Sequence, residues 1–277
     1  MVYIGRTARL QIIREFDFGL FLHGGDLGDI LLPRRYVPAR YNIDDWLDVF
    51  IYLDSDDNLI ATTQKPYAQV GECAYLEVVD TNSVGAFLDW GLQKDLLVPF
   101  KEQRVPMERG KSYVVYVFED NSGRICGSSK LDSFLNEQNE DKFENNQEVD
   151  LLIASRSPMG YKAVINGSHL GLLHNSELLT TVKTGQKMKG YIRQIRPDDA
   201  IDLTLQKQGT EMKDELSEKI LADLKKSGGV SNVTDRSPPE EIFARYQVSK
   251  GNYKKVLGQL YKDKKIILTK DKITLVE

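Results

Sequence analysis

The sequence predicts a mainly β protein with an α/β tail, in which three consecutive five-stranded barrels precede a small helical domain that ends in a β-hairpin. One pattern of short strands and turns occurs three times in residues 1–207. Each copy has too few strands to bury both faces of an open sheet, so closure into a barrel is expected. From residue 211 onward, apolar residues take helical spacing instead.

The first copy, residues 1–66, has segments rich in β-branched, aromatic and leucine residues, which favour strands. Strands are expected at 8–15, 17–22, 29–33, 46–53 and 59–63. The last two are separated by the acidic segment 54–58, which we interpret as a hairpin turn because Asp and Asn favour turns. A metal site there is disfavoured, since adjacent turn carboxylates rarely complete an oxygen shell. Trp46 and Trp90 are expected to pack inside, although Trp90, in a loop after the second strand of the second copy, could equally be exposed.

The second and third copies, residues 67–131 and 148–209, repeat this plan. Their expected strands are 74–79, 84–89, 95–99, 112–118 and 124–127, then 149–154, 159–164, 171–176, 187–195 and 201–205. A glycine recurs at the second strand, as Gly19, Gly85 and Gly160, with spacings of 66 and 75 residues. We interpret it as a bend or a point of close backbone approach.

Residues 210–277 predict a winged-helix domain. A first helix over 211–226 ends at Gly228-Gly229. Ser237 is expected to cap a second helix that starts with two prolines, and Ser249 a third helix over 250–261. Two short strands, 266–269 and 272–276, would form the wing.

Charge divides the chain unevenly around residues 132–147, which are dense in acidic and amide side chains and predict a linker. One short helix anchored by Phe134 and Leu135 could form within it. Residues 1–131 carry a net charge of −5, whereas residues 149–212 carry +2 and residues 213–277 carry +4. A polyanion is therefore expected to prefer the C-terminal half, where phosphate contacts release counterions. The linker predicts one arm made of the first two copies and another made of the rest.

The third copy resembles an S1 RNA-binding domain, an OB-type barrel, through the segment Gly171-Leu-Leu-His-Asn-Ser-Glu-Leu178 and through 185–189 and 198–205. The second copy matches through 85–88 and the first through 18–21. Three S1-like barrels followed by a helical domain are similar to the conserved virulence factor B family of bacterial RNA-binding regulators. This resemblance implies a cytoplasmic protein that binds single-stranded RNA and regulates gene expression post-transcriptionally.

In S1 domains, flat side chains beside the second-strand glycine, two residues after it, and at a third-strand His stack on bases. The resemblance assigns Phe18 and Phe21 in the first copy, Phe87 in the second and His174 in the third, with Tyr161 adjacent to the second-strand glycine. Val84, Pro33 and Pro99 occupy other stacking positions, so no copy has the full set. Nearby cations expected to hold phosphates are Arg34, Arg35, Lys101, Lys162, Lys187, Lys189 and Arg193.

In the winged helix, the third helix and the wing would expose Lys250, Tyr253, Lys254, Lys255, Lys270 and Lys272. Lysines hold phosphates without reading sequence, because Arg, Asn and Gln make the bidentate base contacts. We therefore expect backbone binding, carried mostly by the third copy and the winged helix.

Other interpretations stay open at this point. The rings of Phe18, Phe21, Phe87 and Tyr161 could face the barrel core, and His174 could make a structural hydrogen bond. A DNA-binding transcription regulator led by the winged helix and a protein-interaction scaffold are the alternative functions. Enzyme activity, cofactors, metals and a membrane partner are not expected: the chain lacks a converging catalytic set, and two Cys and three His form no ligand pattern. A signal segment is not expected either.

Overall fold

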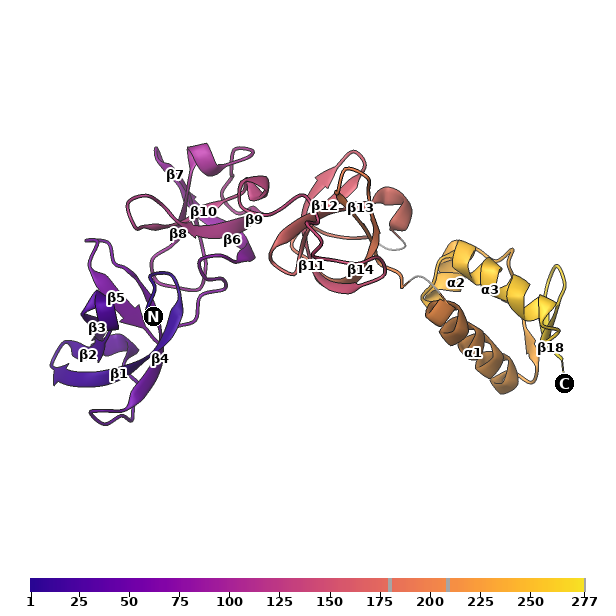
Figure 1. Cartoon of the computed structure of the whole chain (residues 1–277), viewed down its shortest axis with the longest axis horizontal. Coiled ribbons are helices and arrows are strands. Elements are labelled where there is room, and N and C mark those ends of the chain that lie inside the picture. Colours follow the sequence, from indigo (N-terminus) through magenta and orange to yellow (C-terminus); the bar gives the residue numbers. More distant parts are fainter. Residues whose placement is uncertain (179–180, 208–209, 277) are drawn as a thin grey trace.

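The computed structural model describes residues 1–178, 181–207 and 210–276. Three closed five-stranded barrels and then a helical domain follow one another along the long axis of the molecule (Figure 1). The predicted fold class is thereby confirmed. The boundary predicted between residues 209 and 210 touches 208–209, which lie outside the described residues.

The strands agree closely with the predicted segments. Barrel one contains β1 (Thr7–Phe16), β2 (Gly19–His23), β3 (Asp29–Pro33), β4 (Trp46–Leu53) and β5 (Leu59–Thr62). Barrel two contains β6 (Cys73–Thr81), β7 (Gly85–Leu88), β8 (Leu96–Pro99), β9 (Ser112–Glu119) and β10 (Ile125–Ser128). Barrel three contains β11 (Glu148–Ser157), β12 (Gly160–Ile165), β13 (His169–His174), β14 (Lys187–Ile195) and β15 (Ile201–Thr204).

All three barrels share one topology. The first strand pairs with the second and the fourth, and the third pairs in parallel with the fifth, which closes the sheet. Short 3-10 helices follow the third strand each time, at Arg34–Tyr36, Phe100–Glu102 and Asn175–Glu177. Two others are Gly25–Leu27 and Leu131–Ser133.

The recurrent second-strand glycine marks a close approach in each barrel, as predicted. A Cβ on Gly19, Gly85 or Gly160 would overlap the carbonyl oxygen of Leu32, Val98 or Leu173 on the third strand. The first strand also has a register shift at the equivalent place in each barrel, between residues 12 and 14, 78 and 80, and 153 and 155. Such bulges change the direction in which the following side chains of the strand point.

Apolar clusters join the barrels to one another. Phe50 of barrel one meets Trp90 of barrel two edge to face, with ring centroids 5.6 Å apart. Val114 of β9 shares a buried cluster with Leu152 of β11 and Leu170 of β13, which ties barrel two to barrel three. The expectation that the first two barrels form an arm separate from the third is therefore wrong.

The segment 132–147, here called the acidic strap, connects the second and third barrels but packs on them instead of hanging free. Leu135 and Phe143 are buried, and Phe134 stacks on Tyr116 with centroids 4.7 Å apart. Isolated bridges tie Asn136 to His169 and Gln138 to Ala200 of barrel three. Its apolar residues, spaced among the acids, account for this packing, so the strap is a built part of the molecule.

Trp46 was expected to pack and does not: 54% of it is exposed. It pairs with Gln11 on β1, and the alternation of β4 directs Val49 and Ile51 into the barrel while Trp46 faces outward. Trp90 is buried as expected, and its indole N–H donates to the Lys94 carbonyl at 2.6 Å.

The C-terminal domain contains α1 (Thr210–Lys226), α2 (Pro239–Tyr246) and α3 (Lys250–Lys262), with β16 (Val230–Ser231), β17 (Ile266–Leu268) and β18 (Ile273–Leu275) forming one sheet. Ser249 caps α3 as predicted, because its hydroxyl accepts from the Asn252 N–H at 3.2 Å. Ser237 does not cap α2: Pro238 holds that position, and the Ser237 hydroxyl accepts from the Thr234 N–H instead. The short strand β16 was not predicted. In the described part of the chain, no helix is long and apolar enough to span a bilayer.

Candidate nucleic-acid interface

Barrel one presents an aromatic cluster on the outer side of its first hairpin. The rings of Phe16 and Phe18 stack with centroids 5.4 Å apart, and Phe21 meets both edge to face at 5.5 and 6.2 Å. Phe16 is 42% exposed and Phe18 57% exposed. We call Phe16, Phe18 and Phe21 the ring cluster. Exposed flat rings of this kind offer a surface on which bases can stack.

The ring cluster exists because of the hairpin that carries it. Phe16 pairs with Gly19, so Asp17 and Phe18 form a two-residue turn and Phe18 stands at its tip. The bulge after Ile12 then sets Arg14 opposite Phe21, with the guanidinium carbon 5.6 Å from the ring centroid. Arg14 also forms an ion pair with Asp29. A cation therefore stands directly beside the stacking surface.

Of the two predicted arginines that follow β3, one is held by hydrogen bonds and the other is exposed. Arg34 bonds to Glu15 at 3.0 Å and to the Tyr41 hydroxyl at 2.9 Å, and it also reaches the Phe16 carbonyl. The hydrogen bonds from Tyr41 and Arg34 lower the pKa of Glu15. Arg34 therefore helps to hold the hairpin that carries the ring cluster in place. Arg35 lies over the Tyr36 ring at 4.9 Å and stays exposed.

Barrel two has the same first hairpin and bulge as barrel one, but different side chains on its outer face. Phe87 is half-buried and pairs with Asp80, the residue that follows the bulge. Burial, together with the charges of Asp89 and Asp80, raises the pKa of Asp95. This face is therefore acidic around its ring, which disfavours a phosphate there.

The cations closest to that acidic face are occupied elsewhere. Lys94 donates to the carbonyls of Leu53 and Asp54 at 3.1 and 2.7 Å, and Arg124 pairs with Asp57 of barrel one. Lys101 is exposed beside Phe100, which is itself 56% exposed. Of the residues predicted for barrel two, Lys101 is thus available and Phe87 is only partly so.

In barrel three, the His predicted to stack bases makes the structural bond that was its alternative. His174 Nε2 lies 3.0 Å from Asp202 Oδ1, so this nitrogen carries the proton that the carboxylate accepts. Although burial acts to raise it, hydrogen bonds from Gln194 and His174 hold the pKa of Asp202 below its usual range. The His174 side chain remains 26% exposed, so its orientation is fixed while part of it faces solvent.

Tyr161 is half-buried and takes the core-facing position that was its alternative. It pairs with the buried Leu173 and packs against the interior of barrel three. The outward position two residues after the glycine belongs to Lys162, which forms an ion pair with Glu137 of the acidic strap at 2.7 Å. Met159, at the tip of the hairpin, is 60% exposed.

The cations on the fourth strand of barrel three are mostly paired. Lys189 contacts Asp150 at 2.8 Å, and Arg193 contacts Glu177 at 3.2 Å. Lys187 is exposed and makes no ion pair within the described residues. A phosphate approaching this strand would meet one unengaged lysine and two cations already held by acids.

The winged helix exposes most of its predicted lysines. Lys254 and Lys255 are exposed on α3, and Lys270 and Lys272 are exposed at the turn of the wing. Lys250 is half-buried because its ammonium group donates to the carbonyls of Arg236 and Ser237 at 3.3 and 3.0 Å. It therefore helps to hold the start of α3.

Tyr253 was expected on the exposed side of α3, and this is wrong. It is fully buried, its hydroxyl donates to the Val233 carbonyl at 2.8 Å, and its ring stacks on Tyr246. Burial raises the pKa of the Tyr253 hydroxyl. The helical spacing explains the error, because Tyr253 shares the inward face with Val256, Leu257 and Leu260.

Barrel three and the winged helix meet through polar contacts. Asn252 donates to Gln206 at 2.8 Å, and Lys207 lies 3.5 Å from Glu215. Beside this contact lies a hollow of about 520 Å³, lined in part by Arg193, Lys213 and Lys255. One ligand placed there would touch both domains.

Sequence reasoning missed Phe16 and Arg14, which complete the aromatic surface of barrel one. A signal was available: Phe16 stands two residues before Phe18, across the two-residue turn from Gly19. Arg14 faces outward only because of the bulge, which no residue in the sequence marks.

Comparison with known proteins identifies two kinds of domain in the chain. The family model for the S1 domain matches residues 4–64 and 70–130. The model for the CvfB-like winged helix domain matches residues 218–275. The chain therefore has S1 domains in its first two barrels and a CvfB-like winged helix domain at its C-terminal end, both of which are nucleic-acid-binding types of domain.

Several similar proteins match nearly the whole length of the chain. "Uncharacterized protein YitL" of Bacillus subtilis is 29% identical over 275 residues, covering 95% of this chain and 90% of its own. "Conserved virulence factor B" of Staphylococcus aureus is 26% identical over 255 residues, covering 86% and 84%. A crystal structure of a multidomain protein with nucleic acid binding domains from Streptococcus pneumoniae aligns with a TM-score of 0.42 at 23% identity, covering 99% and 98%.

Proposed function

We propose that this protein is a non-enzymatic, single-stranded RNA-binding regulator that acts post-transcriptionally in the cytoplasm. The observation that carries the proposal is the ring cluster of barrel one. Three phenylalanine rings lie within stacking distance of one another, two of them more than a third exposed, with Arg14 beside them. A strand whose bases are unpaired can reach such rings, whereas a duplex keeps its bases stacked inside.

The phosphate-holding part of the proposal rests on the C-terminal half. Lys187, Lys254, Lys255, Lys270 and Lys272 are exposed, and lysine binds phosphate as a point charge. The hollow between barrel three and the winged helix lets one strand contact both. When several weak binding sites contact one strand, binding at one site raises the effective concentration of the strand at the others, and the overall affinity increases.

A role without catalysis fits the cysteines. Burial raises the pKa of Cys73 to about 12 and that of Cys126 to about 11, so neither thiol is a ready nucleophile. The acidic turn 54–58 also has a structural role, because Asp54 accepts backbone N–H groups from Asp56 and Asn58 at 2.9 Å.

The full-length chain should be titrated with labelled single-stranded RNA and with duplex DNA of the same sequence. Tighter binding of RNA supports the proposal. Tighter binding of the duplex would favour a DNA-binding regulator led by the winged helix. Binding of neither would favour a protein-interaction scaffold.

The lysines of α3 supply a second test. K254A/K255A should weaken binding about equally for different RNA sequences and reduce the salt dependence, because these side chains hold phosphates. K225A/K226A removes two exposed lysines from α1 of the same domain and controls for net charge. A loss confined to some RNA sequences would contradict the phosphate-holding role.

A further inference from the structure

We propose that the cleft between barrels two and three binds a phosphate-bearing segment of the RNA strand. We call this cavity the interbarrel cleft; it has a volume of about 520 Å³, within the range of ligand sites. The inference rests on the proposed function, because it adds a site on the path of the same strand. The cleft lies away from the ring cluster, which belongs to barrel one.

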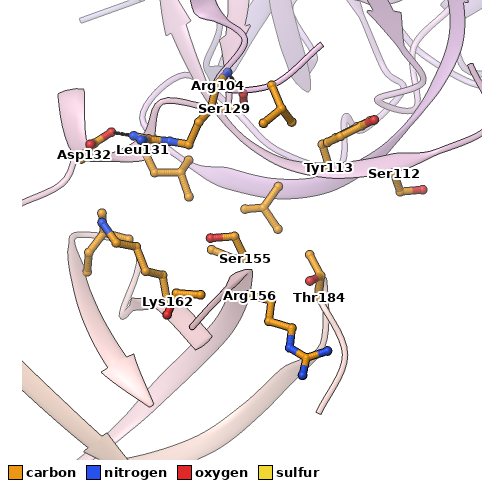
Figure 2. Close-up of a pocket in the computed structure, with 15 residues that line it drawn as sticks. Arg104, Ser112, Tyr113, Ser129, Leu131, Asp132, Ser155, Arg156, Lys162 and Thr184 are labelled. Carbon is orange, nitrogen blue, oxygen red and sulfur yellow. Dashed lines mark hydrogen bonds and ion pairs between the residues drawn. The ribbon is translucent and has the colours of Figure 1, made fainter. Parts of the chain in front are cut away.

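The two sides of the cleft come from different domains. Figure 2 shows Arg104 and Tyr113 on the side of barrel two, and Ser155, Arg156 and Lys162 on the side of barrel three. The bulge in β11 sets Ser155 opposite Lys162, at the position that Arg14 and Phe21 occupy in barrel one. The cleft therefore extends the outer face of barrel three toward barrel two.

The floor of the cleft is apolar and held in place. Val114, Leu131, Ala154 and Leu170 line it, and all four belong to the buried cluster that joins the two barrels. Val105 lies at its edge and is 55% exposed. This floor is part of the packed core between two domains, so it does not open and close freely. The cleft is therefore a preformed surface for contact with a base or ribose.

The charges of the lining favour an anion. Arg104, Arg156 and Lys162 line the cleft together with a single carboxylate, Asp132. Asp132 forms an ion pair with one terminal nitrogen of Arg104, which leaves other guanidinium N–H groups to donate. Arg156 is exposed and makes no ion pair within the described residues. The hydroxyls of Ser155 and Thr184 add neutral donors.

The cleft continues into a second hollow of about 280 Å³ on barrel three, and Ser157, Lys162 and Leu170 line both. The second hollow reaches Arg196 and also Met159, which lies at the exposed tip of the hairpin between β11 and β12. Lys162 stands between the two hollows and is paired with Glu137 of the acidic strap. A phosphate reaching Lys162 would compete with Glu137, so we assign the main phosphate contact in the cleft to Arg156, which makes no ion pair within the described residues.

The experiment uses the full-length chain and a labelled single-stranded oligouridylate of about 20 nucleotides, long enough to reach more than one barrel. R156E should weaken binding about tenfold or more and flatten its salt dependence, since an anion would then face the phosphate. R109E, an exposed arginine of barrel two that does not line the cleft, is the matched control. V105W narrows the cleft without changing charge and should also weaken binding, with thermal unfolding reporting the fold.

Each outcome is decisive. If the wild-type chain binds the RNA and R156E binds it as tightly as R109E does, the cleft is not on the path of the strand, although RNA binding itself stands. If the wild-type chain binds no RNA, the proposed function fails and takes this inference with it. Inorganic phosphate and uridine monophosphate are tested as competitors: displacement of the RNA at micromolar concentration would assign the cleft to a free nucleotide or phosphate and overturn the strand proposal.

Discussion

Barrels one and two have the same strand order, the same first-strand bulge and the same second-strand glycine, yet they present opposite surfaces. The residue after the bulge is Arg14 in barrel one and Asp80 in barrel two, and each faces a phenylalanine, Phe21 or Phe87. At the hairpin tip, barrel one has Phe18 where barrel two has Val84. The fold therefore fixes the geometry of this outer hairpin face, and a few outward-facing side chains decide whether the face can bind an anionic strand.

The same difference explains why Phe87 is a poor stacking site despite its position. A base that stacked on it would bring its phosphate close to Asp80, and Asp89 and Asp95 lie near enough to interact with one another. Like charges at short range cost free energy, and the cost is largest at low salt. Barrel two instead contributes to joining its neighbours, through Trp90 on one side and Val114 on the other.

The largest expected effect comes from removing the rings. F18A/F21A in barrel one should weaken single-stranded RNA binding by about tenfold to a hundredfold or more, since stacking is worth about 1–3 kcal/mol per base. V84A/F87A removes the side chains at the two equivalent positions of barrel two and should change affinity by less than about threefold. Fluorescence anisotropy with one RNA measures both. Equal losses in the two variants would contradict the division of roles.

A smaller effect is expected from exchanging the charges. R14D should weaken RNA binding by about tenfold, and D80R should strengthen it by several-fold, because each changes one phosphate contact. The combined variant R14D/D80R keeps the net charge of the chain, so any change it shows comes from position. If R14D alone bound RNA as tightly as the wild type at every salt concentration, the local role of Arg14 would be refuted.

Much of the fold follows from the sequence, because strand composition, turn residues and the recurrent glycine are local signals. The winged helix was predictable for the same reason: Ser249, Gly228 and the spacing of Leu257 and Leu260 mark helix ends and faces. The full packing of the acidic strap was not predictable: Leu135 was an expected anchor, but acidic density indicated a linker, and Phe143 stands alone among polar residues with no pattern to reveal its burial.

The site was less predictable than the fold. Which side of a strand faces out depends on the bulge, and without it Arg14 could not be placed beside Phe21. Tyr253 was misplaced, and Tyr161 could not be assigned to core or surface, because an aromatic residue next to lysines resembles a binding residue equally well when it packs inward. Ion pairs such as Lys162–Glu137 join residues 25 apart in the sequence and cannot be inferred from local pattern.

The smallest effect tests the acidic face of barrel two directly. Burial, then the charges of Asp89 and Asp80, raise the pKa of Asp95, so its ionised form is disfavoured in the folded state. The stability it contributes is fully present below the unfolded-state pKa of about 3.9 and is lost as the pH rises through the raised folded-state pKa. D95N should therefore raise the melting temperature at pH 7 by a small amount and leave it nearly unchanged near pH 3.5. D48N, on an exposed position of β4, is the control. A melting temperature for D95N at or below that of the wild type at pH 7 would mean that the carboxylates of this face do not repel one another, and the contrast with barrel one would then rest on the rings alone.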